Sequence, residues 1–490
     1  MRLGELCREA GIALSIPNMY DTEITGVSSD TRTLKKGDLF VALRGLHCDG
    51  TQFAAKALSL GACAVVAERS LEGLETVVVP NAREALSYLL DAWYGHPTRD
   101  MKLIGITGTN GKTSSTLMLF HVLRATGHSV GLIGTLECRI NEEIVTVKGQ
   151  NTLANMTTPD PEQLYALLDE MRARGVSYVV MEVTSHALAL GKVAPLHFTR
   201  AVFTNLTADH LDLHGDMETY FCEKQKLFLQ CEAAVICRYH SYGARLWEML
   251  ECPLYDVSQR TVKQVIKRGC EGVSYTLCLP GGEERRVAVP IPGQFSVENS
   301  ALAAMCAYSL GISFDEIYAA LASFPGVRGR MERVDAPGWD VSVFLDYAHT
   351  PDALFQLLYT VREFAENATH ITVLFGCGGD RDRTKRPEMG RVASALADLC
   401  VITSDNCRGE DPKRIIEDIL RGVDKEKPYV VIPDRREAIH YAIANARSGD
   451  IVLLAGKGHE LYEIRGEERL PFSEREIVVE AMRQRLGRMI

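Results

Sequence analysis

The chain has 490 residues, with 54 Lys and Arg against 64 Asp and Glu, so its formal net charge is −10. At roughly 150 residues per domain, this length predicts about three domains, each large enough to bury its own core. The hydrophobic share of 46% excludes disorder as the main state, and the acidic balance excludes a general affinity for nucleic acid.

Apolar runs typical of strands alternate with helix-patterned stretches along the whole chain. The strand candidates lie at 39–43, 64–67, 76–79, 103–106, 178–181, 201–203, 233–236, 341–345, 370–375, 399–403, 429–432 and 451–454. Such alternation predicts parallel sheets covered by helices. The expected fold is therefore α/β, in three domains at 1–98, 99–330 and 331–490, with a breaker-rich linker at 94–98.

The N-terminus and the cysteines bear on where the protein works. The first residues lack a cationic region, an apolar run and a cleavage site, and no stretch approaches 18 uninterrupted apolar residues. The 14 cysteines show no regular spacing. We therefore expect a cytoplasmic enzyme with reduced cysteines and no membrane insertion.

A glycine-rich turn follows the strand candidate at 103–106. The sequence TGTNGKTSS occupies 107–115, and a helix-patterned stretch follows it. Such a turn directs backbone N–H groups and the positive end of a helix at phosphates, Lys112 supplies a cation, and the Thr113 hydroxyl can ligate Mg²⁺. The strict Walker spacing is not met, because Ile106 stands where glycine is required. Nucleotide binding is favoured over a ligand-free turn, which would leave Lys112 unexplained.

Polar residues follow two later strand candidates. Glu182 ends one apolar run, and His210 comes shortly after another. Because strand ends of an open parallel sheet line the ligand crevice, both could reach a metal ion at the glycine-rich turn, although Mg²⁺ prefers oxygen to a histidine nitrogen. Each alone is more often a satisfied polar residue. Residue types and spacing alone predict Lys224 and Lys226 to be solvated surface charges.

Several motifs together resemble one family, the Mur ligases. They lie at 107–114, 182–186, 205–212, 346–351 and 378–382, and a front segment at 29–50 resembles the family's UDP-sugar-binding domain. The resemblance covers essentially the whole chain and is strongest to the branch that adds the third residue of the peptidoglycan stem peptide. It implies a UDP-sugar-binding α/β domain, a central ATPase-like parallel sheet related to P-loop proteins, and a Rossmann-like C-terminal domain.

The resemblance also implies a reaction. A carboxylate of UDP-N-acetylmuramoyl-L-alanyl-D-glutamate attacks the γ-phosphate of ATP, and an amine then displaces phosphate from the acyl phosphate. Two Mg²⁺ ions are implied, and the ligands would be Thr113, Glu182, His210 and Lys224. Lys224 resembles the family's carbamylated lysine, in which CO₂ converts the amine into an anionic ligand. Lys112, Glu182, His210 and Lys224 are thus the expected catalytic residues.

Further binding residues follow from the same resemblance. ATP is expected at Gly108, Thr109, Asn110, Gly111, Lys112, Thr113, Ser114, Asn299, Arg330 and Asp346. The UDP-muramoyl dipeptide is expected at Thr31, Leu46, His47, Cys48, Thr157, Thr158, Thr184 and Lys192. The incoming amino acid is expected at Arg381, Asp405, Asn406, Cys407, Arg408, Gly456 and Glu460.

The motif at 405–408 bears on the choice of amino acid. The family form that adds meso-diaminopimelate carries Asp-Asn-Pro-Arg, and this chain has Asp-Asn-Cys-Arg. A guanidinium grips a second carboxylate bidentately, whereas it repels a lysine ammonium. We therefore expect meso-diaminopimelate, with Arg408 facing its carboxylate and Glu460 its ammonium. Departures at Cys407, Ser296 and Met156 leave L-lysine or another acceptor as alternatives. A third alternative, from a different class, is a non-catalytic nucleotide-binding regulator. A monomer is expected.

Overall fold

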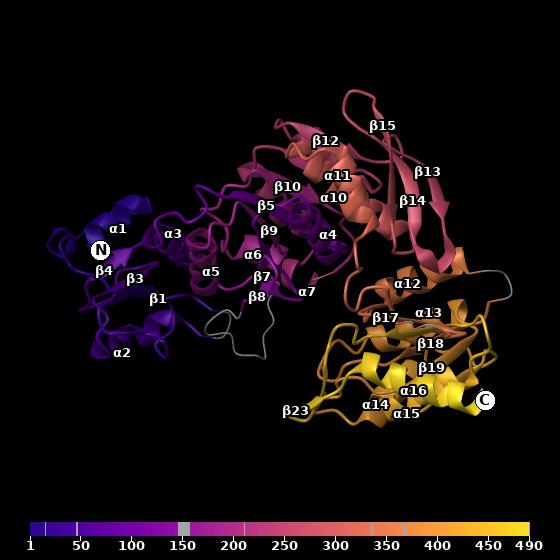
Figure 1. Ribbon diagram of the computed structural model, residues 1–490. Coiled ribbons are helices and arrows are strands. Elements are labelled where there is room, and N and C mark those ends of the chain that lie inside the picture. The colour runs from indigo at the N-terminus through magenta and orange to yellow at the C-terminus, as the bar shows by residue number, and fades with distance from the viewer. Residues whose placement is uncertain are drawn as a thin grey trace. The chain divides into compact units, whose positions relative to one another are not determined.

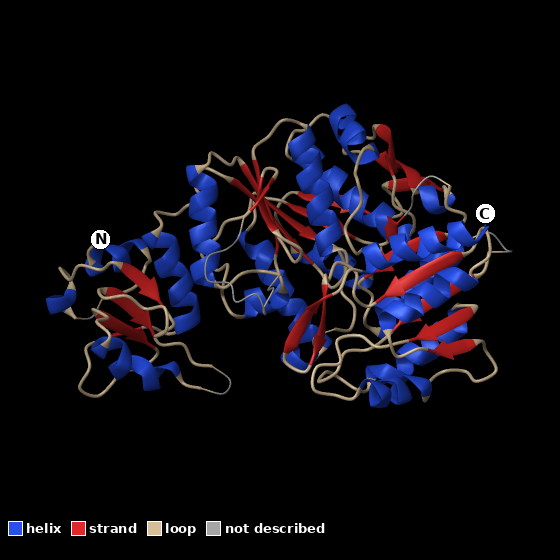
Figure 2. Ribbon diagram, turned by 60° about the horizontal axis from the view of Figure 1, so that its bottom comes forward, coloured by secondary structure: helices blue, strands red, loops and turns tan. Residues whose placement is uncertain are grey.

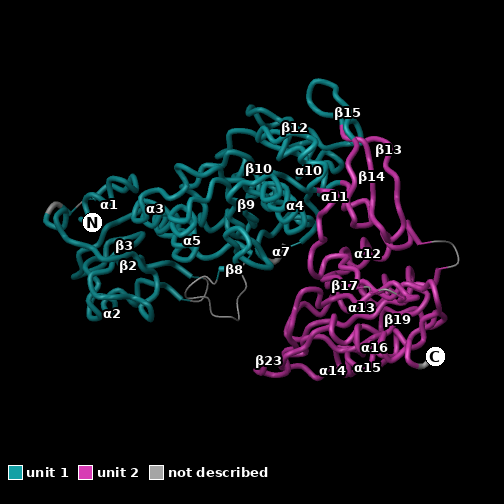
Figure 3. The backbone as a smooth tube through the Cα atoms, viewed as in Figure 1, with its two compact units in different colours: residues 1–262, 278–285, 298–320 teal, residues 263–277, 286–297, 321–490 magenta. Residues whose placement is uncertain are grey.

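The computed structural model describes residues 1–14, 16–45, 48–145, 157–209, 211–334, 336, 338–365 and 369–489. It divides into two compact units (Figure 3): unit 1 comprises 1–262, 278–285 and 298–320, and unit 2 comprises 263–277, 286–297 and 321–490. Both units combine helices with largely parallel sheets (Figure 2), so the predicted α/β class is confirmed. The predicted domain boundaries stay predictions. Within the described ranges, we find no helix with the length and apolar character that crossing a membrane requires.

The first part of unit 1 is a small sheet covered on both faces. Its strands pair in parallel in the order β1-β2-β3-β4, namely Gly26–Ser28, Asp38–Val41, Ala64–Ala67 and Thr76–Val78. Alternate side chains of β2 and β3 point to opposite faces. One face packs with α1 (Leu3–Glu9) and α3 (Ala82–Trp93), the other with α2 (Ala54–Ser59).

The larger sheet of unit 1 has the order β12-β11-β10-β5-β9-β6-β7-β8. Six of its strands are parallel: β5 (Lys102–Thr107), β6 (Val130–Ile133), β9 (Tyr178–Glu182), β10 (Arg200–Phe203), β11 (Ala234–Cys237) and β12 (Leu254–Val257). The last two strands of this order, β7 (Cys138–Ile140) and β8 (Glu143–Ile144), are antiparallel to their neighbours. Register pairs Ile106 with Glu182 and Thr107 with Phe203. The carboxyl ends of β9, β5 and β10 therefore meet at one edge of the sheet.

Helices connect these strands in chain order (Figure 1). They are α4 (Lys112–Ala125), α5 (Pro161–Ala173), α6 (Ser185–Ala189), α7 (Leu211–His214), α8 (Met217–Gln225) and α9 (Ser241–Met249). A separate three-stranded sheet comprises β13 (Val262–Lys267), β14 (Val273–Cys278) and β15 (Glu284–Val289). Two more helices, α10 (Gln294–Ser309) and α11 (Phe314–Ala322), come later in the chain, after β15.

Unit 2 is built on a six-stranded sheet in the order β16-β17-β21-β18-β19-β20. The strands are Glu332–Val334, Ser342–Asp346, Ile451–Ala455, Ile371–Phe375, Leu399–Ile402 and Tyr429–Val431, and β16 is antiparallel. Its helices are α12 (Pro351–Phe364), α13 (Lys385–Leu396), α14 (Pro412–Leu420), α15 (Arg435–Asn445) and α16 (Glu474–Met489). A hairpin of β22 (Tyr462–Arg465) and β23 (Glu468–Pro471) follows β21. The apolar faces of α15 and α16 pack on the sheet.

Candidate functional site

The turn between β5 and α4, residues 108–111, is called the glycine loop below. Gly108 has φ +152° and Gly111 φ +83°, conformations that side-chain-bearing residues rarely adopt. A Cβ at Gly108 would lie 1.9 Å from the Thr204 hydroxyl, and one at Gly111 would lie 2.4 Å from Asn299 Oδ1. The loop therefore needs glycine at both positions, and it ends at the N-terminus of α4, which favours an anion.

The segment after β10 holds the glycine loop in shape. The backbone N–H of Thr109 donates to the Asn205 carbonyl (2.9 Å), and that of Asn110 donates to Asn205 Oδ1 (2.9 Å). The Thr204 hydroxyl donates to the Asn110 carbonyl at 2.6 Å. Neither Thr204 nor Asn205 was among the predicted site residues. Their position directly after a strand of the same sheet is the signal that could have identified them.

Two lysines converge on one carbonyl of this loop. Lys112 Nζ donates to the carbonyls of Gly108 (2.9 Å) and Thr109 (2.8 Å), and Lys224 Nζ donates to the Gly108 carbonyl at 2.9 Å. Lys224 is 1% exposed and its Nζ lies 4.7 Å from the centre of the Tyr220 ring. Burial, and next the charge of Lys112, lower the pKa of Lys224 well below its ordinary value.

The burial of Lys224 contradicts the expectation that it is a solvated surface charge. That expectation was wrong because α8 turns the face carrying Tyr220 and Lys224 inward against the glycine loop, a contact across 116 residues of sequence. Lys226, by contrast, has a side chain that is 50% exposed and pairs with Glu223 at 2.7 Å.

Glu182, at the end of β9, is the centre of a hydroxyl-rich cluster. Its Oε2 accepts hydrogen bonds from the hydroxyls of Thr113 and Thr135, both at 3.0 Å, and its Oε1 accepts from the Thr135 N–H at 2.9 Å. The carboxylate is 1% exposed. Carboxylate and hydroxyl oxygens are the donors that Mg²⁺ prefers, so Thr113 and Glu182 fit a magnesium ion beside the glycine loop. His210, the third predicted ligand, lies outside the described residues.

The predicted dipeptide-binding residues of the central region lie near Glu182. The Thr158 hydroxyl donates to the Glu182 carbonyl at 2.9 Å and accepts from the Thr184 N–H at 3.2 Å, and the hydroxyl oxygens of Thr157 and Thr135 lie 3.0 Å apart, within hydrogen-bond distance. Lys192, buried, pairs with Asp160 at 2.9 Å. These residues therefore form a polar group at the end of β9.

Only some of the residues predicted to bind the UDP-muramoyl dipeptide in the front segment lie within the described residues. Thr31 is half-buried in the turn after β1, and Cys48 is exposed beside Asp49. Leu46 and His47 lie outside the described residues, as does Met156. Ser29, two residues before Thr31, donates from its N–H (3.1 Å) and its hydroxyl (2.5 Å) to Glu162 of α5, which ties this turn to the first turn of α5.

The remaining predicted ATP contacts are divided between the units. In unit 1, Asn299 of α10 accepts from the Ser115 hydroxyl at 3.3 Å, and Ser114 is half-buried in the first turn of α4. In unit 2, Asp346 accepts from the N–H groups of Met331 (2.7 Å) and Ala348 (2.8 Å). Burial raises the pKa of Asp346, and the Arg330 guanidinium opposes this shift.

Two loops of unit 2 bring the predicted amino-acid-binding residues together. Asn406 Nδ2 donates to Glu460 at 2.8 Å, and Lys457 Nζ donates to Asn406 Oδ1 at 2.9 Å. Gly456 has φ +115°, and a Cβ there would lie 2.8 Å from Asp405 Oδ2. Burial raises the pKa of Glu460, although Asn406 and Lys457 oppose this shift. Acidic, amide and cationic groups thus alternate around the ends of β19 and β21.

Arg435 holds these two loops and was not predicted. It is 1% exposed and donates to the carbonyls of Ser404 (3.1 Å) and Ala455 (2.8 Å), the residues directly before Asp405 and Gly456. Glu474, also buried, pairs with it at 2.8 Å. An arginine in the first turn of an ordinary helix carries no sequence signal for such a positioning role.

The two arginines and the cysteine that were predicted to bind the incoming amino acid have different surroundings. Arg408 is half-buried with φ +49°, and its Nη1 donates to the carbonyls of Gly379 (2.9 Å) and Asn406 (3.3 Å). Arg381 is exposed on the loop after β18. Cys407 is 5% exposed and its thiol lies 3.7 Å from the Ile464 carbonyl of β22. The cysteine side chain therefore packs against the hairpin.

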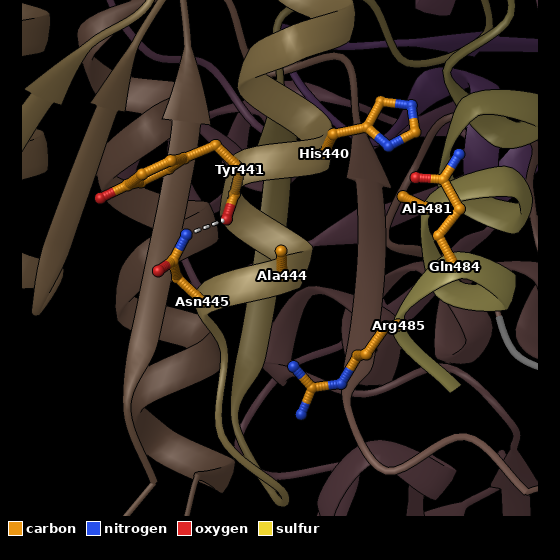
Figure 4. A pocket seen from close by; sticks show the side chains of 7 residues that line it. All are labelled: His440, Tyr441, Ala444, Asn445, Ala481, Gln484 and Arg485. Carbon is orange, nitrogen blue, oxygen red and sulfur yellow. Dashed lines mark hydrogen bonds between the residues drawn. The ribbon is translucent and has the colours of Figure 1, made fainter. Parts of the chain in front are cut away.

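A hollow elsewhere in unit 2 does not coincide with any predicted residue. It has a volume of about 520 Å³ and lies between α15 and α16 (Figure 4). Its lining residues are His440, Tyr441, Ala444, Asn445, Ala481, Gln484 and Arg485. Arg485 is engaged by Asp340 at 2.8 Å and by the carbonyls of Ile443 and Ala446. We assign this hollow no part in the chemistry.

Three family models each match a different segment of the chain. Residues 106–307 match the Mur ligase middle domain, 329–458 match the Mur ligase glutamate ligase domain, and 23–94 match the Mur ligase family catalytic domain. The chain belongs to the Mur ligase family. It has the three-domain architecture of these ligases and is an ATP-dependent, amide-bond-forming enzyme, as the sequence motifs predicted.

The similar proteins include two curated Mur ligases. The UDP-N-acetylmuramoyl-L-alanyl-D-glutamate--2,6-diaminopimelate ligase of Caldanaerobacter subterraneus subsp. tengcongensis is 42% identical, covering 98% of this chain and 99% of that protein. The enzyme of the same name from Gloeobacter violaceus is 41% identical, covering 100% and 99%. A solved structure of a ligase with this name is 29% identical and superposes with a TM-score of 0.73, covering 99% of this chain and 100% of that one.

Proposed function

We propose that this Mur ligase joins meso-diaminopimelate to UDP-N-acetylmuramoyl-L-alanyl-D-glutamate with ATP, in the cytoplasm and as a monomer. The observation that carries the proposal is the convergence of Lys112, Lys224 and the Thr113–Glu182 pair on a single glycine loop. That loop would take the phosphates of ATP, with contacts from Gly108 to Ser114. The relatives named above support the choice of substrates.

Thr113 and Glu182 would hold Mg²⁺, with His210 and a carbamylated Lys224 at a second ion. Bound Mg²⁺ neutralises charge on the transferring phosphoryl oxygens. The protein contributes a buried carboxylate of fixed orientation. Three hydrogen bonds donated by Thr113 and Thr135 hold both carboxylate oxygens of Glu182 in the absence of a cation. Lys112 Nζ, now on loop carbonyls, is positioned to turn toward the outer phosphates.

The burial of Lys224 supports the proposal that it is carbamylated. The reaction joins the neutral amine nitrogen to the carbon of CO₂ and releases one proton, leaving an anionic carbamate. Burial against Gly108 and the Tyr220 ring disfavours the charged ammonium, so the amine is available. The new oxygens would extend from Nζ beside the glycine loop, where a metal ligand is needed.

The loops of unit 2 support recognition of a second amino-acid end. Arg408 would bind the distal carboxylate of meso-diaminopimelate and Glu460 an ammonium, with Asp405, Asn406 and Gly456 shaping the pocket. The Asn406 side chain donates a hydrogen bond to the Glu460 carboxylate, which holds that carboxylate next to the loop that carries Arg408. Thr31, Cys48, Thr157, Thr158, Thr184 and Lys192 would contact the UDP-muramoyl dipeptide.

The proposal is tested with purified protein, ATP, Mg²⁺ and UDP-muramoyl dipeptide, by measuring phosphate release with meso-diaminopimelate or L-lysine. We expect release to depend on the amino acid and to be faster with meso-diaminopimelate. Faster turnover with L-lysine would overturn the specificity assignment. Nucleotide binding without phosphate release from either pair would instead favour a non-catalytic regulator.

We expect Arg408→Ala to raise the KM for meso-diaminopimelate about 10- to 100-fold while the KM for ATP changes little. The reason is the loss of a charge-assisted bidentate contact, which contributes about 1.5–3 kcal/mol. Steady-state kinetics with each substrate varied separately measures this. Arg391→Ala is the matched control, because Arg391 is an exposed arginine of α13 that pairs with Glu388. An unchanged amino-acid KM in Arg408→Ala would place Arg408 outside the pocket.

A further inference from the structure

A group of ligand-type side chains lies in unit 1 apart from the residues assigned above. Cys237 ends β11, His240 precedes α9, and Glu298 lies on α10. Cys237 Sγ is 3.9 Å from Glu298 Oε2, and His240 Nε2 is 3.5 Å from the same oxygen. The thiol, imidazole and carboxylate ligand atoms all lie within 4.8 Å of one another.

The backbone holds this group in place. Cys237 and His240 lie on either side of a two-residue turn, and α9 begins directly after it. A Cβ at Gly243 would lie 1.9 Å from the Cys237 carbonyl, so α9 can approach the end of β11 this closely only with glycine there. His240 has extended backbone and makes no capping hydrogen bond with its ring, which leaves the ring directed at Glu298.

We propose that Cys237, His240 and Glu298 form a binding site for a transition-metal divalent cation of the Zn²⁺ class. A thiolate, an imidazole and a carboxylate are the ligand types that Zn²⁺ takes, and three protein ligands leave a fourth position for water. The same set suits Mg²⁺ poorly, because that ion prefers oxygen alone. The site is therefore chemically distinct from the magnesium site at Glu182.

Charge and exposure agree with this assignment. A Cys237 thiolate and the Glu298 carboxylate together neutralise a divalent cation. Cys237 is fully buried, whereas the His240 side chain is 41% exposed and gives the ion a route in. The nearby Asp256 carboxylate is paired with Arg238 (3.7 Å) and accepts a hydrogen bond from Ser258 (2.7 Å), so these two charges offset each other.

Without a cation, the thiol keeps its proton. Burial, and next the charge of Glu298, raise the pKa of Cys237 to about 12. Its hydrogen bond with Glu298 raises the pKa of His240. Cation binding must therefore release the thiol proton, as is general for thiolate sites. The bound ion would tie the β11–α9 turn to α10, next to Asn299 and its hydrogen bond with Ser115 of α4.

The test is titration of the full-length, metal-stripped protein with Zn²⁺ in excess Mg²⁺, followed by calorimetry and thermal melting. We expect one equivalent to bind and to raise Tm, and Co²⁺ to produce a thiolate-to-metal charge-transfer absorption band. Cys237→Ser should abolish that band and weaken Zn²⁺ binding about 100-fold or more. His240→Ala should weaken binding as well, and its half-exposed position makes it the variant that keeps the fold. Cys222→Ser and His197→Ala, at exposed positions, should bind as the parent does.

Two results would overturn the site. One is Zn²⁺ uptake by the parent that equals uptake by Cys237→Ser and His240→Ala. The other is a Co²⁺ thiolate band that persists in Cys237→Ser, which would assign the thiolate to another cysteine. Because binding, absorption and Tm are measured without substrates, the outcome is independent of ligase activity and of the choice of amino acid.

Discussion

Lys224→Ala should lower kcat by about 10³-fold or more, the largest effect we expect from a single substitution. The variant loses the anionic ligand that carbamylation would supply to a metal ion beside the glycine loop, and such charge stabilisation supplies several kcal/mol. Phosphate release under saturating substrates measures the loss. A short carboxylate such as acetate should restore part of the activity, because the space left by the side chain is next to the Gly108 carbonyl.

Matched variants separate carbamylation from simple loss of charge. Lys226→Ala, a substitution two residues after Lys224, should retain parent activity because the Lys226 side chain is exposed and pairs with Glu223. Lys224→Arg keeps a cation but cannot form the carbamate, so it should be as inactive as Lys224→Ala. NMR of protein equilibrated with ¹³C-labelled bicarbonate should show a carbamate resonance that is absent from both variants. Full activity in Lys224→Ala would remove this residue from the site.

Glu182→Gln should lower kcat by about 10²- to 10³-fold and raise the Mg²⁺ concentration needed for half-maximal rate. The carboxylate accepts three hydrogen bonds from Thr113 and Thr135. The amide of glutamine would direct its own N–H groups at these donors, and it would also remove the negative charge. Rate measured against Mg²⁺ concentration tests both effects. Thermal melting should show whether the variant is folded.

Glu170→Gln is the control for this change. Glu170 lies on α5, where it pairs with Arg174 at the surface, so neutralising it should change neither rate nor Mg²⁺ dependence. A Glu182→Gln variant with the Mg²⁺ dependence of the parent protein would mean that Glu182 acts only in holding the end of β9 to Thr135.

The glycine loop could be predicted because its information is local. Gly108, Gly111, Lys112 and Thr113 lie within six residues, directly after an apolar run, and a strand followed by such a turn and a helix has few alternative conformations. Glu182 could be predicted because strand ends of a parallel sheet share an edge, and the register of β5 with β9 places it there. Its partner Thr135 was missed although it follows β6 in the same way.

Lys224 shows where such reasoning stops. The nine residues of α8 have no clear apolar face, so nothing local distinguishes Lys224, which is buried, from Lys226, which is exposed. Only the resemblance to a family indicated Lys224. Arg435 is a second case, because its partners are carbonyls at the ends of two strands that lie far from it in sequence.

The order of residues was enough to predict the class of the fold, the nucleotide-type turn and, through ordered motifs, the Mur ligase family. These depend on periodicity and on short-range backbone geometry, which neighbouring residues specify. The tertiary structure alone decided which charged side chains are buried and what they contact: Lys224 on Gly108, Arg435 beneath two loops, and Cys237 beside Glu298. The burial of a charge depends on the elements that pack around it, and those come from distant parts of the chain.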